Sequence, residues 1–201
     1  MIMLEQFEFH HILLEYYSSS GQKKESIEKN LSHYLKEVVV ITIDMCGFTN
    51  EVREIGLLHF LSKIAIMKQI VHKSLTDKFV ILKSDADNVF LISNSTIKNN
   101  NEKQLLQESL ELLELLFMNI DINNKHVEKQ KKIEISVGID MGECLFPIKN
   151  DFYGYSLNIA SKLGEDEAKI DEIFFSKECY AIIKENIHNS PLFDKIKKGI
   201  H

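Results

Sequence analysis

The pattern of apolar and polar positions predicts a chain in which strands alternate with helices. Residues 37–44 form an apolar, β-branched run that is typical of a buried strand. Apolar residues at steps of three and four then predict a long helix over 48–75 and another over 104–120. Between them, residues 78–93 hold two β-rich segments around a tight polar turn, which indicates a β-hairpin.

The second half of the chain continues this order. Five more elements are expected: two strands joined by a turn over 133–147, a helix over 155–164, a strand over 172–176 and a helix over 177–186. The turn is expected at Met141 and Gly142, and Gly164 is expected to stop the helix before it. The resulting order, β-α-β-β-α-β-β-α-β-α, predicts an α/β fold of the ferredoxin-like sandwich type.

The N-terminal part stands apart from this pattern. Residues 4–17 mix aromatic and acidic side chains and fit either a strand or a short helix, and the SSSGQ stretch at 18–22 is a flexible break. Residues 24–36 have the apolar spacing of a helix. The chain therefore divides into an N-terminal extension over 1–36, helical in part, and one domain over 37–201.

Composition narrows the class of protein. Hydrophobic residues make up 44% of the 201 residues, which is enough for a core. A net charge of −6 argues against nonspecific nucleic-acid binding but leaves room for a small anionic ligand. The 3 cysteines are widely spaced, which argues against a disulfide framework or a zinc site and favours a reducing, cytoplasmic compartment. No signal peptide and no membrane span are expected.

Two aspartates indicate where the chemistry lies. Asp44 ends the first strand, and Asp87 lies in the turn of the hairpin that follows. In a β-α-β-β unit these positions fall on neighbouring central strands, so the two carboxylates could converge. Converging carboxylates repel, and hard divalent cations supply the opposite charge while also binding substrate phosphates. Either aspartate alone fits a capping role at a strand end or turn, but together they favour a metal site.

Four segments in register resemble the catalytic domain of the class III nucleotidyl cyclases, the adenylate and guanylate cyclases. They are ITIDMCGFT at 41–49, KSDADNVFLI at 83–92, ISVGIDMGECL at 135–145 and DFYGYSLNIASKLGE at 151–165. The trailing EIFFSKECY fits the strand and helix that close that domain. The resemblance runs from about residue 37 to 185. It implies a mainly antiparallel central sheet with flanking helices.

The resemblance also implies roles for the first half of the site. Asp44 and Asp87 would each ligate both ions of a pair of Mg²⁺ or Mn²⁺. The triphosphate would be cradled by backbone N–H groups at the turn into a helix, those of Cys46, Gly47, Phe48 and Thr49. The implied reaction is attack of the ribose 3′-hydroxyl on the α-phosphate of a nucleoside triphosphate, which releases pyrophosphate.

The remaining matches concern the base and the reacting centre. Lys83 and Asp151 occupy the purine-selecting positions, where guanine-specific members usually carry Glu and Cys. A lysine can donate to a ring nitrogen and an aspartate can accept from the adenine amino group, so the pair favours ATP and cyclic AMP. Asn158 would position the ribose or stabilise the reacting centre.

Several positions depart from the family pattern. Lys162 stands where the family usually has an arginine, and lysine offers a point charge in place of a bidentate fork. Ala86 replaces the glycine that usually precedes the second metal aspartate, and Asp85 adds an acid beside it. Lys198, followed by Gly199, matches a late Lys-Gly motif that contacts the triphosphate. In the family a closing strand follows that motif, so we expect this strand to be cut off or absent here.

Three functions remain open from the sequence. In the family one domain supplies the metal carboxylates and another the asparagine and base, so a single domain implies a homodimer with two sites, or else a monomer without its regulatory region. The first function is an adenylate cyclase, and the second is a cyclase for UTP or CTP, as in antiphage signalling. The third is a non-catalytic module for nucleotide binding or dimerisation. Asp44, Asp87 and Asn158 together argue against the module, whereas Lys162 and the short C-terminus argue for it.

Overall fold

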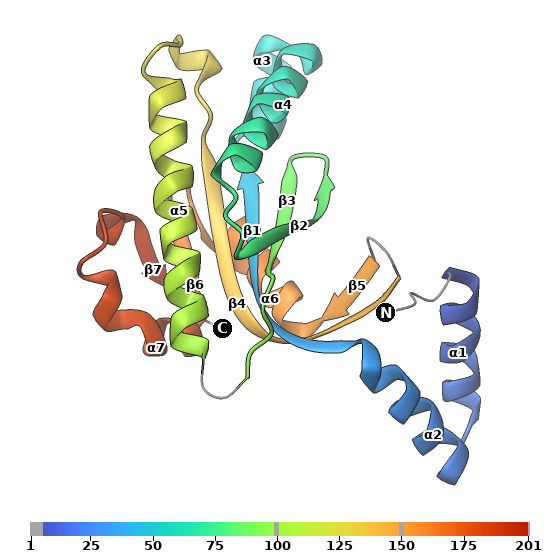
Figure 1. Ribbon diagram of the computed structural model, residues 1–201. Helices are drawn as coiled ribbons and strands as arrows, with labels where there is room; N and C mark the ends of the chain where they lie inside the picture. The colour runs from blue at the N-terminus through green and yellow to red at the C-terminus, as the bar shows by residue number, and fades with distance from the viewer. Residues whose placement is uncertain (1–5, 99–100, 149–150, 201) are drawn as a thin grey trace.

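The computed structural model describes residues 6–98, 101–148 and 151–200, without the side chains of 48–50, 148 and 151. Its core is one sheet in the order β2-β3-β1-β4-β6-β7, with β5 paired to β4 (Figure 1). The strands are β1 (Leu35–Met45), β2 (Phe79–Asp85), β3 (Asn88–Ser93), β4 (Ile135–Ile148), β5 (Asp151–Gly154), β6 (Ile173–Phe175) and β7 (Ile196–Lys198).

The sheet is mainly antiparallel, as expected. Strand β1 lies between β3 and β4 and runs antiparallel to both, and β2 pairs antiparallel with β3. Only the β4–β6 and β6–β7 pairings among the described strands are parallel. The order of the first four strands, β2-β3-β1-β4, is that of a ferredoxin-like sandwich.

The two faces of the sheet are covered differently. The helices are α1 (Gln6–Ser18), α2 (Gly21–Leu31), α3 (Phe48–Ile55), α4 (Leu57–Ser74), α5 (Glu102–Asn124), α6 (Tyr155–Lys162) and α7 (Lys177–Ile187). Helices α4, α5 and α7 pack on the face that includes Ile41 and Ile43. The opposite face, with Val38 and Val40, packs against α6 and β5. Strand β1 is therefore buried on both sides, which explains its continuous β-branched sequence.

The stretch 48–75 holds the expected long helix, α4, but a separate short helix precedes it. Two helices occupy this stretch, and Gly56 separates α3 from α4. The φ angle of Gly56 is 91°, a value that residues with a side chain rarely adopt. The apolar spacing continues across the break, so the pattern alone did not reveal it.

The turn expected at Met141 and Gly142 is also wrong. Strand β4 runs from Ile135 to Ile148 without interruption and pairs with β1 through both residues. A Cβ atom on Gly142 would lie 3.4 Å from Ser156 of α6. That distance is an ordinary contact, so it is the φ angle of Gly142, 156°, that favours glycine here, and the second strand of this unit is the separate β5.

The helix over 155–164 does not stop at Gly164. After α6 the chain continues as a π-helical turn over Leu163–Glu167. Thr42 of β1 donates a hydrogen bond of 2.8 Å to the carbonyl oxygen of Ala160. A Cβ atom on Gly138 would lie 1.9 Å from that same oxygen. This close contact fixes α6 and the turn after it on the sheet.

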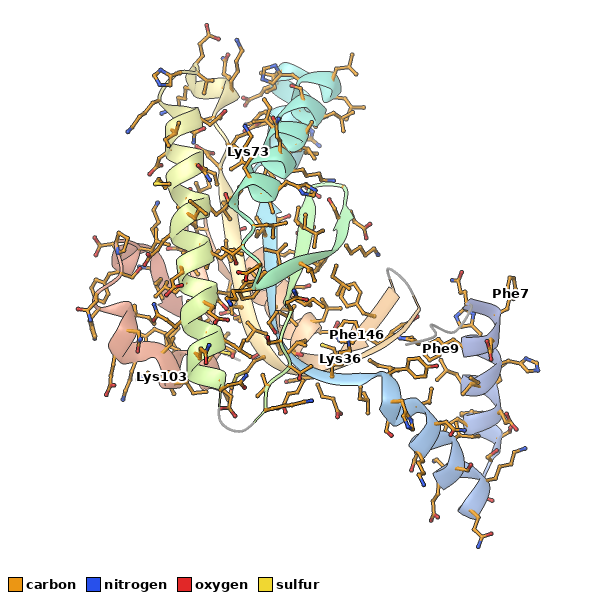
Figure 2. The ribbon with its side chains drawn as sticks, in the orientation of Figure 1. Phe7, Phe9, Lys36, Lys73, Lys103 and Phe146 are labelled. Carbon is orange, nitrogen blue, oxygen red and sulfur yellow. The ribbon has the colours of Figure 1, made fainter. Side chains whose placement is uncertain are left out.

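The N-terminal extension forms a pair of helices that projects from the domain (Figure 1). The described part of residues 4–17, a segment whose sequence fitted either a strand or a short helix, is helical and belongs to α1. Phe9 is buried and its ring lies 5.6 Å from that of Tyr153 in β5, whereas Phe7 is 89% exposed and points away from the domain (Figure 2). Where α2 leads into β1, the ammonium of Lys36 lies 5.7 Å from the ring centre of Phe146. None of the helices in the described ranges is long and apolar enough to cross a membrane.

Asp140 in β4 is a buried carboxylate away from the aspartates discussed above, and it makes the stability of the fold depend on pH. Burial raises its pKa above the ordinary 3.8, although Ser176 and the N–H of Met141 oppose this by hydrogen bonding. The folded chain therefore binds a proton that the unfolded chain has lost, so this contribution to stability declines as pH rises above about 4. We expect Asp140→Asn to have a higher Tm than the parent protein at pH 7 and an equal one near pH 4. A lower Tm at pH 7 would mean that the hydrogen bonds outweigh the burial.

Candidate active site

The ends of β1 and of the β2–β3 hairpin bring Asp44 and Asp87 together. Asp44 lies opposite Asn88 of β3 and Ser136 of β4. The N–H of Met45 donates to the carbonyl oxygen of Asp87 at 3.2 Å, so the hairpin turn lies directly against the end of β1. Asp44, at the end of β1, thus lies beside the turn that carries Asp87.

The surroundings of Asp44 disfavour its ionised form. Burial, together with the negative charges of Asp87 and Glu165, raises its pKa to about 7, although a hydrogen bond from the Met45 N–H acts in the opposite direction. Close negative charges of this kind favour protonation or the binding of a positive ion. The geometry therefore creates a place where a cation would be stabilised.

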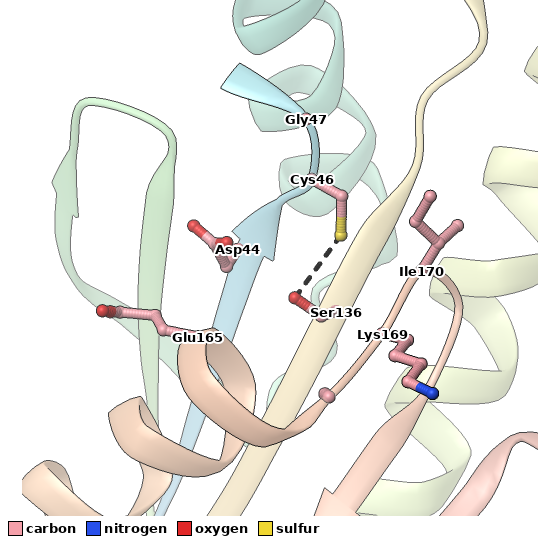
Figure 3. A pocket seen from close by; sticks show the side chains of 8 residues that line it. Asp44, Cys46, Gly47, Ser136, Glu165, Lys169 and Ile170 are labelled. Carbon is pink, nitrogen blue, oxygen red and sulfur yellow. Dashed lines mark hydrogen bonds between the residues drawn. The ribbon is translucent and has the colours of Figure 1, made fainter. Parts of the chain in front are cut away.

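Glu165 is a third carboxylate that the sequence did not bring into the site. It lies in the π-helical turn after α6, on the same side of the sheet as Asp44 (Figure 3). Burial raises its pKa, and the charges of Asp166 and Asp87 add to the effect. No sequence signal would have found it, because the expected end of the helix at Gly164 removed Glu165 from the face of α6.

A hollow of about 550 Å³ opens beside these carboxylates. Its lining residues are Asp44, Cys46, Gly47, Ser136, Glu165, Ala168, Lys169 and Ile170. The thiol of Cys46 donates to Ser136 at 3.6 Å (Figure 3), and burial raises the pKa of this thiol to about 11, so it stays neutral. The ammonium of Lys169 points away from Asp44.

The turn between β1 and α3 has the backbone shape expected of an anion-binding turn, with one correction. Gly47 has φ 91° and precedes the first residue of α3, whose leading N–H groups point out of the helix. The N–H of Cys46, however, already donates to the carbonyl oxygen of Glu134 at 3.0 Å. Cys46 therefore cannot join the cradle in this conformation. The side chains of Phe48 and Thr49 lie outside the described residues.

Lys83, which is expected to select the base, lies on the same side of the sheet as Asp44. Lys83 pairs in register with Phe90, and the ring of Phe90 lies 6.0 Å from that of Phe152. Phe152 follows Asp151, whose side chain lies outside the described residues, so the backbone of Asp151 is near the hairpin. The ammonium of Lys83 forms an ion pair with Asp85 at 2.5 Å. The extra acid thus contacts the residue expected to select the base.

Asn158 and Lys162 both lie on α6, which packs on β1 and β4. Asn158 lines a second hollow with Leu35, Glu143 and Tyr155, and this hollow shares no lining residue with the one beside Asp44. Ser156, two residues before Asn158, stands against Gly142, and Ala160, two residues after it, stands against Gly138. Asp44 pairs with Ser136, so at about 3.3 Å per residue Asn158 lies roughly 13 Å along β4 from the level of Asp44. The two residues therefore line different hollows of the same chain.

Lys198 is likewise remote from Asp44. It ends β7 at the edge of the sheet, paired with Phe175 of β6, and two strands separate β7 from β1. The N–H of Gly199 donates to the carbonyl oxygen of Phe175 at 2.8 Å. Lys198 therefore ends β7, the edge strand that pairs with β6, and Gly199 follows directly after it.

The donor atoms suit a hard cation but do not form a complete coordination set. Carboxylate oxygens are the ligands that Mg²⁺ and Mn²⁺ prefer. Within the described ranges, no group of three or more His, Cys, Asp or Glu side chains is arranged to hold a metal ion. Asp44 and Asp87 could therefore hold cations only together with oxygen atoms from water or from a phosphate ligand.

Comparisons with known proteins place the fold. No protein-family model and no curated protein matches the sequence. Among solved structures, the chain is similar to an adenylate/guanylate cyclase/hydrolase from Silicibacter pomeroyi, with 15% identity, a TM-score of 0.59 and coverage of 76% of this chain and 82% of that one. It is also similar to the guanylyl cyclase domain of the RhoGC fusion protein from Blastocladiella emersonii, with 15% identity, a TM-score of 0.57 and coverage of 75% and 86%. A third is the adenylyl cyclase CyaB from P. aeruginosa, with 21% identity, a TM-score of 0.54 and coverage of 75% and 82%. The chain has the fold of the class III nucleotidyl cyclase catalytic domain.

Proposed function

We propose that the protein is a nucleotidyl cyclase that converts a nucleoside triphosphate, preferably ATP, into its 3′,5′-cyclic monophosphate and pyrophosphate. The observation that carries the proposal is the convergence of Asp44 and Asp87 beside the turn into α3. The fold adds support, because the solved structures it resembles include adenylate and guanylate cyclases.

The role proposed for Asp44 and Asp87 is to hold two Mg²⁺ or Mn²⁺ ions. Such ions, when bound, acidify the attacking hydroxyl and neutralise the phosphates and leaving group. The raised pKa of Asp44 supports this role, because a divalent cation would relieve the repulsion that burial and neighbouring acids create. The ribose 3′-oxygen would form a bond to the α-phosphorus while the bond to the bridging oxygen breaks.

The triphosphate would lie on the N-terminus of α3, held by the N–H groups of Gly47, Phe48 and Thr49. Aligned backbone dipoles give this end of the helix a partial positive charge. Gly47 has φ 91°, which favours glycine, and it places no side chain over the turn. Lys198 would contact the phosphates only if it came from elsewhere in an assembly.

A homodimer would complete the site. Asp44 and Asn158 line separate hollows, roughly 13 Å apart along β4, which supports an active site that takes the aspartates from one chain and Asn158 with Lys162 from the other. Exposed apolar side chains surround Asn158, among them Tyr155 at 76% and Tyr153 at 43% exposure. A two-fold axis would then generate two equivalent sites.

Lys162 should limit the rate in such a site. A lysine stabilises a phosphoryl transition state as a point charge, whereas an arginine would bind two oxygens in a planar fork. We expect Lys162→Arg to raise kcat by roughly threefold to tenfold with little change in KM, since a bidentate contact strengthens in the transition state. Lys162→Gln is the control, and it should lower kcat. An unchanged kcat in both variants would remove Lys162 from the mechanism.

The base of the nucleotide substrate has a second candidate, a pyrimidine. Lys83 and Asp151 favour adenine, but the ion pair with Asp85 engages the ammonium of Lys83 and weakens this argument, so a cyclase for CTP or UTP is the alternative. The test is incubation of the protein with Mn²⁺ and each of ATP, GTP, CTP and UTP, followed by identification of the cyclic product. Product from UTP or CTP alone would replace the adenylate proposal, and no product from any would leave a non-catalytic nucleotide-binding module.

A further inference from the structure

A buried ion pair joins α3 to α4 beneath the turn that precedes α3. The ammonium of Lys63 donates to both carboxylate oxygens of Glu51, at 2.8 and 2.6 Å. The side chain of Lys63 is only 3% exposed, and that of Glu51 is 23% exposed. Lysine is almost never buried so deeply without a partner, and here the partner satisfies its charge.

Glu51 lies against the proposed phosphate-binding turn. Its N–H donates to the carbonyl oxygen of Gly47 at 3.0 Å, which closes the first turn of α3. One of its carboxylate oxygens would be 3.4 Å from a Cβ atom on Gly47. A negative charge at this point competes with a triphosphate for the positive end of the helix and repels it.

Further acids stand near the same turn. Glu51, Glu54 and Glu134 line one hollow together with Lys129. The carbonyl of Glu134 also accepts the N–H of Cys46 at 3.0 Å. Because acidic side chains outnumber basic ones around this hollow, the positive charge of Lys63 is needed to offset the local negative charge.

We propose that Lys63 is a positioning residue for the substrate: it neutralises Glu51 and holds that carboxylate in place so that the turn can accept a triphosphate. Lys63 does not touch the substrate and acts through Glu51. This inference rests on the proposed function, because it assigns the control of nucleotide affinity within the same site.

The alternative is that the pair only ties α3 to α4 across Gly56. A buried ion pair is weak evidence of stabilisation, because desolvation of the two charges offsets much of their attraction. A purely structural pair predicts that loss of either partner harms folding and activity in the same direction. The proposed role predicts opposite effects of the two partners on substrate affinity.

The test compares Lys63→Met, Glu51→Gln and the double variant by KM and kcat for the preferred nucleotide with Mn²⁺. We expect Lys63→Met to raise KM by roughly tenfold or more, because the bare charge of Glu51 then faces the phosphates. Glu51→Gln should lower KM below the parent value, and the double variant should return to within about threefold of it. Lys63→Arg should retain the parent KM. Lys73→Met, which removes an exposed lysine at the end of α4 (Figure 2), is the matched control and should change nothing.

Binding of inorganic tripolyphosphate by calorimetry separates this inference from the proposed function. If the protein turns over no nucleotide, the same order of affinities, Glu51→Gln tightest and Lys63→Met weakest, would still support the role of Lys63. Single variants that both weaken binding, or both lower kcat and Tm without opposite changes in affinity, would overturn it. Failure of the parent protein to bind tripolyphosphate would overturn it as well.

Discussion

Replacement of Asp44 by Asn is expected to abolish cyclase activity while it stabilises the metal-free protein. Asp44→Asn and Asp87→Asn should each lower kcat by roughly 10³-fold or more, because a neutral amide cannot hold the cations that neutralise the reacting phosphates. Circular dichroism should show an unchanged fold. The measurement is product formation with Mn²⁺ at saturating nucleotide.

The expected gain in stability follows from the environment of Asp44. Burial and two neighbouring carboxylates raise its pKa to about 7, so its ionised form is disfavoured in the folded chain. Removal of the charge should add about 1–2 kcal/mol at pH 8 in EDTA, after allowance for partial exposure, and raise Tm by a few degrees. A lower Tm for Asp44→Asn than for the parent protein would show that contacts within the folded chain stabilise the ionised carboxylate, which would contradict this account of Asp44.

Two inactive chains are expected to restore activity when they are mixed. If each site combines aspartates from one chain with Asn158 from the other, a heterodimer of Asp44→Asn and Asn158→Ala contains one site with neither substitution. Random exchange of subunits gives half heterodimers, so activity should return to about a quarter of the parent value. The measurement is activity after mild denaturation and joint refolding of the two variants.

The matched control for this mixing experiment uses two substitutions in the same half of the site. Asp44→Asn mixed with Asp87→Asn should remain inactive, because every site then lacks one metal ligand. Recovery in this control, or none in the first mixture despite verified heterodimers, would contradict an active site shared between chains.

The sequence was sufficient for the parts of the fold that depend on local periodicity. The β-branched run that ends at Asp44 and the hairpin around Asp87 predicted neighbouring strands, and the structure has them in register. The order of elements predicted the ferredoxin-like sandwich for the same reason, since each strand and helix carried its own apolar spacing.

The parts that failed depend on contacts between distant segments. Gly142 looked like a turn residue, but it lies inside β4, where it pairs with Val38 of the distant strand β1. Gly164 looked like a helix stop, but contacts with Thr42 and Gly138 hold it inside a longer turn. That turn is what brings Glu165 beside Asp44, and no periodicity of a single segment could reveal it.

The site was partly predictable for a similar reason. The proximity of Asp44 and Asp87 could be predicted from the order of the strands. The hydrogen bond from Cys46 to Glu134 and the ion pair of Lys83 with Asp85 depend on local geometry that the pattern of apolar and polar residues does not reveal. The separation between Asp44 and Asn158 agrees with the expectation of a site shared between two chains, which stays a prediction until the mixing experiment is done.

The most direct test of the central claim is the stoichiometry of the reaction with the purified protein, Mn²⁺ and its preferred nucleotide. Phosphorus NMR should show one pyrophosphate for each 3′,5′-cyclic monophosphate formed, and the 3′-deoxy analogue of the nucleotide should give no product. Release of inorganic phosphate with a nucleoside diphosphate, or no turnover of any of the four nucleotides by an intact dimer, would contradict the claim.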